Sequence, residues 1–390
     1  MQRADPDEEL EGSISFDGEW PPGPVLGAKE RGRMGSTAPP HGSEQTKPAA
    51  RLGAEFDIAS AKPLKPSRTI AMSPGVEAYC VRFSPDGTLL AVATSVGTVE
   101  LFRTVDGAAA CTLDPGGKRE RRPCTALCFR PSSGGELTKN VLLTGDAHGD
   151  LRHWHATSGA CLSSLHEAGN QVLSVAYRAD GQLFASAGLD CAVRVYSEVT
   201  RTLLHTLAHG DGKTTAGHSN RVFAVKFHPS EPHLLVSGGW DSTVQVWDLR
   251  EGRSVRSVFG PHLCGDGLDL AGNTLLTAAW APTDQLQLWD VMTTQLLATF
   301  EWAQPSPQSE PCRLYAAQLG RGAAEGLIAA GGSGSNELRL IRKATGQVVG
   351  TLRHLDKAIY SLGFSSKGDM LVACTPSFCH FFDIAQLGNS

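Results

Sequence analysis

The sequence predicts an all-β fold built from a repeated unit of short strands. In the clearest unit, Gly217 to Asp248, two apolar runs flank a turn at Pro229, and a tight turn at Asp241 precedes a third, alternating run. The 43 glycines suit a chain with many turns. Residues that match Phe227 in the first run recur every 43 to 50 residues, at Phe83, Phe129, Tyr177, Phe227, Leu270, Leu319 and Phe364. Seven such positions predict seven repeats.

The Gly217–Asp248 unit resembles a WD40 repeat, one blade of a β-propeller. It carries a Gly-His pair, Gly217-His218, and ends about thirty residues later on Trp247-Asp248. The resemblance implies a seven-bladed WD40 β-propeller over residues 67–386. Its blades are expected near residues 76–113, 124–165, 169–207, 217–259, 260–300, 313–352 and 354–384.

The other repeats depart from this pattern to different degrees. In the third unit, Ser186, Asp190 and Tyr196 stand at the Ser, Asp and Trp offsets, and Asn170 replaces the histidine. The second unit keeps Thr144 and Trp154 but has His148 at the Asp offset, and the fifth keeps Thr277 and Trp289-Asp290. Units one, six and seven have Phe102, Ile341 and Phe382 at the Trp offset and are recognised from register and apolar pattern alone.

The N-terminal segment is expected to be disordered up to residue 66 and then to contribute a strand to the last blade. Residues 1–66 are rich in Pro, Gly, Ala and charge and are expected to be disordered, with Phe16 to Trp20 as an alternative docking peptide. The last blade has only three strands before the C-terminal tail, 387–390, while the strand Thr69–Met72 has no blade of its own. We expect this strand to complete the final blade, because the pairing would satisfy two unpaired edges.

Composition narrows the class of partner and the compartment. The net charge of −5 and pI near 6.2 give no bulk attraction to nucleic acid or an anionic membrane, so nucleic acid is not an expected partner. No run of about eighteen apolar residues predicts a membrane span, and the acidic N-terminus lacks the apolar stretch of a secretory signal. The ten cysteines are therefore expected to be reduced thiols in a cytoplasmic or nuclear protein, with a monomeric propeller.

Four residues of the clearest unit suggest chemistry at first sight. The WD40 resemblance implies that His218, Ser237, Asp241 and Trp247 form a hydrogen-bonded tetrad. A hydrolase interpretation would need an exposed serine and an oxyanion hole, whereas these residues are expected between strands. The favoured interpretation is a structural brace that satisfies buried polar groups.

The sequence predicts neither a metal nor a cofactor. His148, His153 and His155 cluster in one repeat, but the alternation around Trp154 is that of an ordinary strand, and Cys124 and Cys128 have strand spacing. No C-x-x-C or H-E-x-x-H motif is present. Gly212-Lys213-Thr214 resembles the end of a phosphate loop, but Leu207 stands where the first glycine is needed and a strand follows.

The partner-binding site is expected on the top face, the face that in WD40 proteins carries the links between blades. The long links are of this kind: Asp114 to Pro123, Ala208 to Ala216 and Glu301 to Pro311. Four residues before each anchor stand Tyr79, Thr125, Leu173, Phe223, Asp266, Tyr315 and Tyr360, and the resemblance places them around the central opening. The four aromatic residues among them, together with Trp240 and Arg221, form the predicted site, with Arg313 as a further carboxylate or phosphate contact. The alternative is that the aromatic residues only pack the blade tops.

A basic run, Lys118, Arg119, Arg121 and Arg122, lies in the first long link. Its interpretations are a solvated loop, a nuclear-import patch, a site for phosphopeptide or RNA, or a site that captures the acidic segment Asp5–Glu11 in cis. The favoured function is a non-catalytic scaffold or adaptor that binds a protein or peptide within a complex. The alternative from another class is a metal-dependent hydrolase or lactonase, for which Asp266 is the one acid in the predicted ring.

Overall fold

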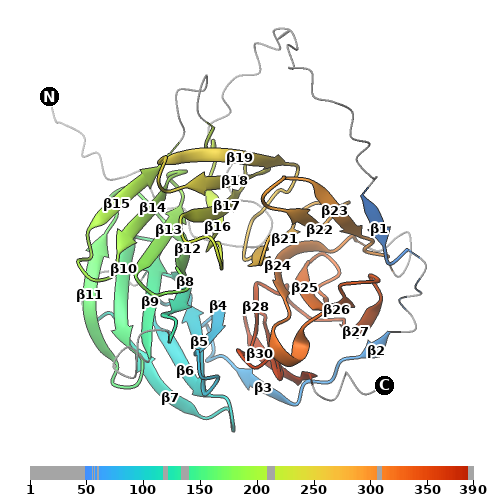
Figure 1. Ribbon diagram of the computed structural model, residues 1–390. Coiled ribbons are helices and arrows are strands. Elements are labelled where there is room, and N and C mark those ends of the chain that lie inside the picture. Colours follow the sequence, from blue (N-terminus) through green and yellow to red (C-terminus); the bar gives the residue numbers. More distant parts are fainter. Residues whose placement is uncertain are drawn as a thin grey trace, which may run out of the picture. The chain divides into compact units, whose positions relative to one another are not determined.

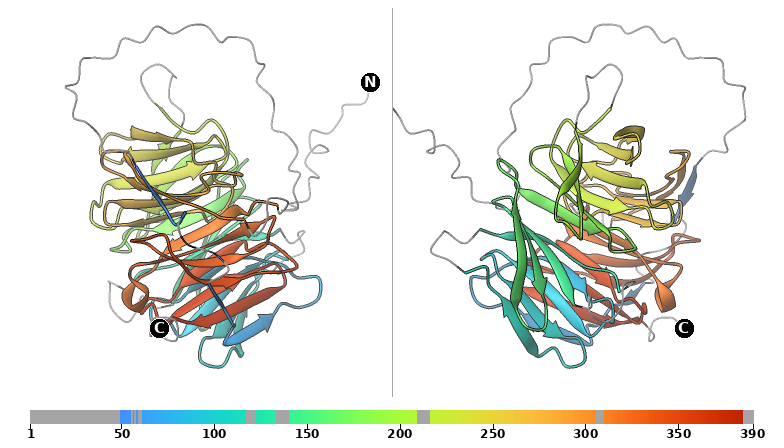
Figure 2. Two further views of the ribbon diagram at one scale, coloured as in Figure 1. Left: turned by 90° about the vertical axis from the view of Figure 1, so that its right-hand side faces the viewer. Right: turned by 60° about the vertical axis from the view of Figure 1, so that its left-hand side comes forward.

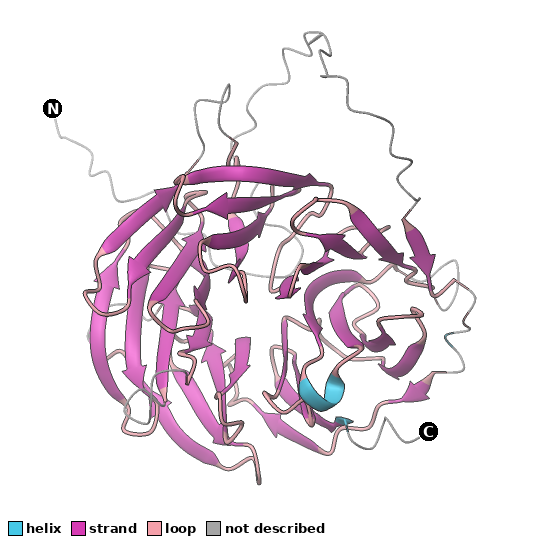
Figure 3. Ribbon diagram, viewed as in Figure 1, coloured by secondary structure: helices cyan, strands magenta, loops and turns pink. Residues whose placement is uncertain are grey.

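The computed structural model describes residues 49–54, 56, 58, 61–116, 122–132, 140–208, 216–304 and 310–384. Their strands form seven sheets that surround a central axis, so the seven-bladed, all-β propeller is confirmed (Figure 1). Strands dominate the architecture, and a short 3-10 turn, η3 (Gly322–Ala324), follows the first strand of blade 6 (Figure 3). No helix among these residues is long and apolar enough to cross a membrane.

Each of the first four blades is a four-stranded antiparallel sheet whose first strand is innermost. Blade 1 contains β4 (Ala78–Phe83), β5 (Leu89–Thr94), β6 (Val99–Arg103) and β7 (Ala109–Leu113). Blade 2 contains β8 (Cys124–Phe129), β9 (Val141–Asp146), β10 (Asp150–His155) and β11 (Ala160–His166). Blade 3 contains β12 (Val172–Tyr177), β13 (Leu183–Gly188), β14 (Val193–Ser197) and β15 (Leu203–Leu207). Blade 4 contains β16 (Val222–Phe227), β17 (Leu234–Gly239), β18 (Thr243–Asp248) and β19 (Arg253–Phe259).

The last three blades recruit strands from the N-terminal part of the chain. Blade 5 contains β20 (Leu268–Ala271), β21 (Thr274–Ala278), β22 (Leu286–Asp290) and β23 (Leu296–Phe300), with β1 (Ala50–Leu52) outside it. Blade 6 contains β24 (Arg313–Leu319), β25 (Leu327–Ser333), β26 (Leu338–Arg342) and β27 (Val348–Leu352), with β2 (Lys62–Pro63) outside it. Blade 7 contains β28 (Ser361–Phe364), β29 (Met370–Cys374), β30 (Phe378–Asp383) and, outermost, β3 (Arg68–Ala71).

The core lies between neighbouring blades rather than within one of them. The middle strands are covered on both faces, so every residue of β17 is buried, whereas the outer strand β11 is largely exposed. One cluster joins Ala185 and Val195 of blade 3 to Val225 and Leu235 of blade 4. A blade therefore cannot bury its apolar faces alone, which makes ring closure a condition of stability.

The ring closes through an N-terminal strand. Strand β3 pairs antiparallel with β30, with Arg68 opposite Phe381 and Ala71 opposite Phe378. Blade 7 thereby takes its first three strands from the end of the described chain and its fourth from a segment that precedes blade 1 (Figure 1). This pairing provides partners for two strand edges that would otherwise be open.

Residues 49–66 differ from the expectation of disorder up to residue 66. Strand β1 pairs in parallel with β23, with Ala50 opposite Ala298, and β2 pairs in parallel with β27, with Lys62 opposite Gly350. These strands are too short to show a hydrophobic period, and their partners lie far away in the sequence, so local pattern could not reveal them. Residues 1–48 and 385–390, which include the expected docking peptide and C-terminal tail, lie outside the described residues.

The N-terminal segment is seated by specific contacts. Leu64 is buried, and its Cδ2 lies 2.4 Å from where a Cβ would stand on Gly350, so only glycine leaves room for it. Arg51 forms ion pairs with Asp284, at 3.1 Å, and with Glu301. The outer edges of blades 5, 6 and 7 are thus covered by β1, β2 and β3, while β7, β11, β15 and β19 end their sheets in the described chain.

Candidate functional site

The predicted tetrad residues form one continuous hydrogen-bonded chain in blade 4. The Trp247 Nε1–H donates to Ser237 Oγ at 2.7 Å, Ser237 Oγ is 2.7 Å from His218 Nε2, and His218 Nδ1 is 2.9 Å from Asp241 Oδ2. The ionised Asp241 carboxylate can only accept, so the proton of the neutral histidine is on Nδ1 and points to Asp241, and Nε2 accepts from the Ser237 hydroxyl. His218, Ser237 and Trp247 are fully buried, which leaves Ser237 no access to a substrate.

Asp241 anchors this chain at the top of the blade. It also accepts the backbone N–H groups of Ser219 at 3.0 Å and Thr243 at 3.1 Å. Burial alone would raise the pKa of Asp241, but the hydrogen bond and charge of His218, with the backbone donors, outweigh burial and lower this pKa. The carboxylate is therefore held ionised as the acceptor that ends the chain.

Blade 3 builds the equivalent brace from different residues. Sequence comparison predicted Asn170 in place of the histidine, but the residue that contacts Ser186 is Glu167, which lies nineteen positions before it, as His218 lies nineteen before Ser237. The Tyr196 hydroxyl donates to Glu167 at 2.7 Å, and Asn170 Nδ2 donates to the same carboxylate at 2.6 Å. The prediction failed because it aligned on the glycine before Asn170 instead of on the distance to the serine.

The remaining blades keep less of the pattern. Trp154 donates to Thr144 in blade 2 and Trp289 donates to Thr277 in blade 5, each at 3.0 Å. At the Asp offset of blade 2, His148 instead donates its backbone N–H to Asp146. These contacts satisfy buried polar groups within each blade.

The residues predicted to line the central opening share a structural cause. In five inner strands the pairing register skips one residue: Tyr79, Thr125, Leu173, Phe223 and Tyr315. Each is the extra residue of a β-bulge, a feature that bends a strand and turns a side chain out of the regular alternation. In blades 5 and 7 the corresponding residues lie before the inner strand instead: Asp266 is two residues before β20, and Tyr360 directly precedes β28.

Aromatic residues on the top face touch one another across five blades. We call this set the aromatic crescent: Phe223, Trp240, His262, Trp280, Tyr315, Tyr360 and Tyr79. The ring centroids follow one another at 5.8 Å from Phe223 to Trp240, 6.0 Å to Trp280, 6.5 Å to Tyr315, 5.6 Å to Tyr360 and 6.3 Å to Tyr79. His262 lies between the two tryptophans, 4.5 Å from Trp240. The inner strands that carry or adjoin Phe223, Tyr315, Tyr360 and Tyr79 surround the central axis (Figure 1).

The crescent has a buried part and an accessible part. Tyr79, Phe223, Tyr315 and Tyr360 are each less than a tenth exposed, while Trp240, His262 and Trp280 are half-buried. Burial lowers the pKa of His262, so its ring is neutral at pH 7. The rings therefore pack the blade tops, as the alternative interpretation held, and also leave a central aromatic surface at the tryptophans.

Two arginines accompany the crescent. The Arg313 guanidinium lies 4.6 Å from the centre of the Trp280 ring, a cation–π distance. Arg221 is half-buried just before β16, and its backbone carbonyl accepts the N–H of Trp240 at 2.9 Å. Sequence reasoning identified both arginines and Trp240, but it gave no binding role to Trp280 or to His262, which lies in a link without any motif.

Asp266, the acid that a hydrolase would need, already forms ion pairs with residues of other blades. Asp266 pairs with Arg82 of blade 1 at 2.7 Å and lies 4.0 Å from Lys226 of blade 4. Burial alone would raise the pKa of Asp266, but the two cations outweigh burial and lower it. In the part of the chain that the structure describes, no group of three or more His, Cys, Asp or Glu side chains could hold a metal ion.

Several predicted features fall outside the described residues. Lys118, Arg119 and Arg121 of the basic loop do, as does the segment that resembles a phosphate loop. Arg122 is described and exposed, and its backbone carbonyl packs against Gly97.

Comparison with known proteins adds a family and three relatives. The family model "WD domain, G-beta repeat" matches residues 159–197 and 210–248. Over 45% of this chain, it is 25% identical to autophagy-related protein 16 of Arabidopsis thaliana. Over 49% of this chain, it is 25% identical to the U3 small nucleolar RNA-associated protein 21 homolog of Schizosaccharomyces pombe. It is 32% identical to the target of rapamycin complex subunit wat1 of Schizosaccharomyces pombe over 28%. These matches span 31%, 19% and 33% of the respective relatives, so a third of their length at most.

The matched repeats agree with the architecture. The match at 159–197 begins one residue before the outer strand of blade 2 and ends with the third strand of blade 3, so one sequence repeat joins two blades. That offset leaves one strand, β3, before blade 1 and only three strands for blade 7, and the pairing of β3 with β30 completes the ring. The two matched repeats and the seven blades together support a WD40-repeat β-propeller.

Proposed function

We propose that this protein is a non-catalytic scaffold that binds a segment of a protein partner on the top face of its propeller. The observation that carries the proposal is the aromatic crescent, in which seven rings from five blades meet on one face. Aromatic residues held by packing are the anchors that dominate binding energy at protein interfaces. The relatives add support, since one of them is named as the subunit of a complex.

The contact surface would centre on Trp240 and Trp280. Their rings are 6.0 Å apart and nearly parallel, and both stay partly accessible while their neighbours hold them in place. A partner side chain that covers them gains apolar contact without having to order the site first. Arg313, which stacks on Trp280, places a cation at the same point and would favour a partner segment with a carboxylate or phosphate.

The partner is a protein or peptide within a larger assembly, and the propeller itself acts as a monomer in the cytoplasm or nucleus. This part of the proposal rests on relatives that are named for a complex and for a nucleolar RNA. Asp266 supports a binding role over a hydrolytic one, because its carboxylate is neutralised by Arg82 and Lys226.

Quantitative affinity purification with mass spectrometry tests the proposal. The tagged full chain is compared with the Trp240→Ala and Trp280→Ala variants, and both are expected to lose the same subset of partners. These two residues are chosen over Phe223, because Phe223 is 5% exposed and its removal would also damage packing.

The matched control is Leu162→Ala, which removes an exposed apolar side chain from the outer strand of blade 2. Thermal unfolding of every variant verifies that the propeller remains folded. A partner list unchanged in both tryptophan variants, or changed equally by Leu162→Ala, would refute binding at the crescent.

A further inference from the structure

A pocket of about 440 Å³ lies on the top face where blades 7 and 1 meet, and we call it the seam pocket. Its walls come from the end of β3 and the link to β4, from Ser95 in the turn after β5, and from Ser377 and Phe378 at the turn between β29 and β30. Links between blades and turns after second strands also carry the exposed part of the crescent. The volume is in the range of pockets that bind small ligands, so one long side chain fits.

Hydrogen bonds across the seam hold the walls in place. The N–H of Met72 donates to the carbonyl of Ser377 at 2.9 Å, which joins blade 7 to the link. The N–H of Glu77 donates to Ser95 Oγ at 3.0 Å, and the N–H of Ser95 donates to the carbonyl of Glu77 at 2.8 Å, which joins the link to blade 1. The pocket is therefore preorganised, and an occupant need not order it on binding.

The seam pocket has apolar walls around one carboxylate. Phe378 is 39% exposed, Val76 is half-buried and Met72 is buried. Among the described residues that line the pocket, Glu77 is the only one with an ionisable side chain. Its exposed carboxylate accepts a long hydrogen bond, of 3.5 Å, from the Tyr79 hydroxyl and forms no ion pair within the described chain.

Basic residues that adjoin the walls do not line the pocket. The Arg68 guanidinium donates to carbonyls of the turn after β6, on the opposite face. Arg122 meets the turn after β5 through its backbone carbonyl, at Gly97. The His380 ring lies 5.9 Å from the ring of Phe378, and burial lowers the pKa of His380, so this ring is neutral at pH 7. The described lining therefore carries a net negative charge.

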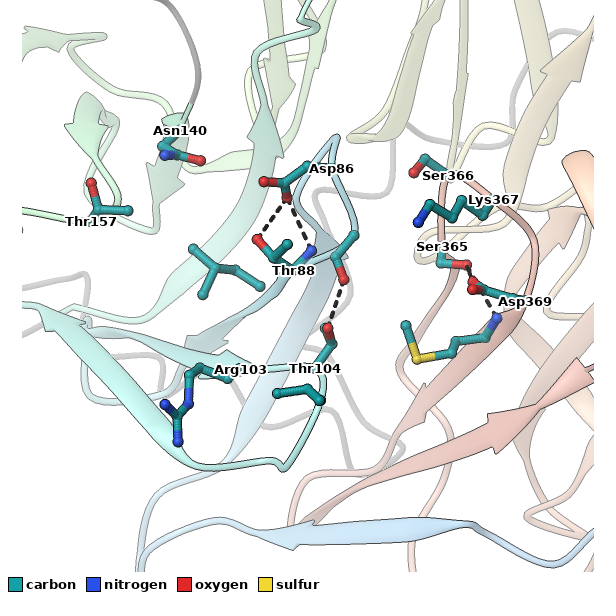
Figure 4. Close-up of a pocket in the computed structure, with 14 residues that line it drawn as sticks. Asp86, Thr88, Arg103, Thr104, Asn140, Thr157, Ser365, Ser366, Lys367 and Asp369 are labelled. Atoms are coloured by element: carbon teal, nitrogen blue, oxygen red, sulfur yellow. Dashed lines mark hydrogen bonds between the residues drawn. The ribbon is translucent and has the colours of Figure 1, made fainter. Parts of the chain in front are cut away.

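A pocket of about 420 Å³ on the opposite face differs in charge. Turns of blades 1, 2 and 7 line it, and Figure 4 shows Asp86 and Asp369 there together with Arg103 and Lys367. Both signs of charge are present, so charge selects no occupant in that pocket. The seam pocket, by contrast, presents one sign.

The seam pocket adjoins the crescent through Tyr79, whose hydroxyl contacts Glu77. From the Tyr79 ring, contacts lead through Tyr360 and Tyr315 to Trp280, with steps between ring centroids of 6.3, 5.6 and 6.5 Å. An extended segment advances about 3.3 Å per residue, so at most about six residues cover this path. One partner segment can therefore contact the exposed tryptophans and also reach the seam pocket.

We infer that the seam pocket takes the side chain of a lysine or arginine from the partner segment that the crescent binds, an inference that rests on the proposed function. The aliphatic stem would lie against Met72, Val76 and Phe378, and the cation would pair with Glu77. An uncharged side chain would fit the walls but would cover the carboxylate without giving it a partner, which costs free energy. The basic residue would stand within about six residues of the one that covers the two tryptophans.

Peptides selected on the full chain from a random phage-displayed library test this inference. Peptides that lose binding to Trp240→Ala or Trp280→Ala occupy the crescent, and we expect them to share a lysine or arginine at a constant spacing from an apolar residue. If these peptides lack a shared basic residue, the inference is overturned and the proposed function stands. If no selected peptide needs the tryptophans, the proposed function fails and this inference fails with it.

Removal of the charge alone locates the contact. In a selected peptide, lysine is replaced by norleucine, or arginine by citrulline, which keeps the length of the stem. Fluorescence anisotropy is expected to show that this change weakens binding to the wild type about tenfold, whereas Glu77→Gln binds both peptides equally. Thermal unfolding verifies that each variant remains folded.

Asp356→Asn is the matched control. Asp356 is exposed in the link between β27 and β28, on the same face and outside the lining of the pocket. This variant is expected to keep the tenfold difference between the two peptides. If the difference persists in Glu77→Gln, or disappears in Asp356→Asn as well, the cation is not bound in the seam pocket and the inference is overturned.

Discussion

Blades 3 and 4 solve the same structural problem with opposite hydrogen-bond patterns. In blade 4 the bonds run in one direction, from Trp247 through Ser237 and His218 to Asp241, and both inner members donate and accept. In blade 3 the bonds converge, because the donors of that blade point to the single carboxylate of Glu167. We call the blade 4 chain from Trp247 to Asp241 the relay, and the blade 3 donors around Glu167 the hub.

The difference teaches that the position of a brace is more constrained than its chemistry. Ser186 and Ser237 occupy the same position in the second strand, and Tyr196 and Trp247 the same position in the third. A buried polar group at each position must find a partner, but a carboxylate or an imidazole can supply it. The two designs nevertheless predict different responses to the same kind of substitution.

The largest effect is expected for Glu167→Gln. The amide has one oxygen and one nitrogen, so part of the hub would present a donor to the donors of Asn170 or Tyr196. The free energy of unfolding in urea is expected to fall by about 2–4 kcal/mol. His218→Gln is the matched change in the relay, where one donor and one acceptor suffice, and its expected loss is about 1 kcal/mol. The hub description is wrong if the two losses are equal or reversed.

Ser237→Ala is expected to cost about 2–3 kcal/mol, because it orphans both the Trp247 N–H and the Nε2 of His218 in a fully buried site. Ser186→Ala in the hub removes one of several donors and orphans none, so its expected cost is about 0.5–1 kcal/mol. Urea unfolding of both variants measures the contrast. Equal costs would show that the serines act alike and that the direction of the bonds is unimportant.

Acid provides a third test of the relay. The pKa of Asp241 is lowered in the folded state, so its stabilisation is fully present above its unfolded pKa, close to 3.8, and is lost as the pH falls through the lower, folded value. The stability difference between the wild type and Asp241→Asn, measured by urea unfolding at several pH values, is therefore expected to shrink as the pH falls below about 4. A difference that stays constant down to about pH 2 would contradict the shift.

The smallest effect is expected for Tyr196→Phe. The ring keeps its stacking on Phe184, at 5.0 Å and 9°, and Glu167 keeps its other donors. The expected loss is about 0.5–1 kcal/mol, from one hydrogen bond, and thermal or urea unfolding can measure it. A loss above about 3 kcal/mol would mean that the tyrosine hydroxyl, and not the set of donors, fixes the carboxylate.

Part of the aromatic crescent was predictable because its residues recur at a fixed offset in the sequence. Tyr79, Phe223 and Tyr315 each stand four residues before an anchor, and the structure shows that each is the bulged residue of its inner strand. A fixed offset in sequence thus corresponds to a fixed departure from the pleat. That these rings join through Trp280 and His262 was not predictable, because both lie in connections whose course depends on the neighbouring blade.

The sequence by itself determined the number of repeats, the order of strands within a blade and the members of the blade 4 relay. These are set by period-2 alternation, turn residues and fixed offsets, all of which act within about forty residues. Tertiary structure alone decided that Glu167 is the hub, that Leu64 fills the space above Gly350, and that turns from blades 1, 2 and 7 line one pocket. Glu167 lies within thirty residues of its partners, but a glutamate at that offset belongs to no motif. The other two depend on which surfaces meet when the ring closes, and contacts between residues so distant in the chain leave no local period to read.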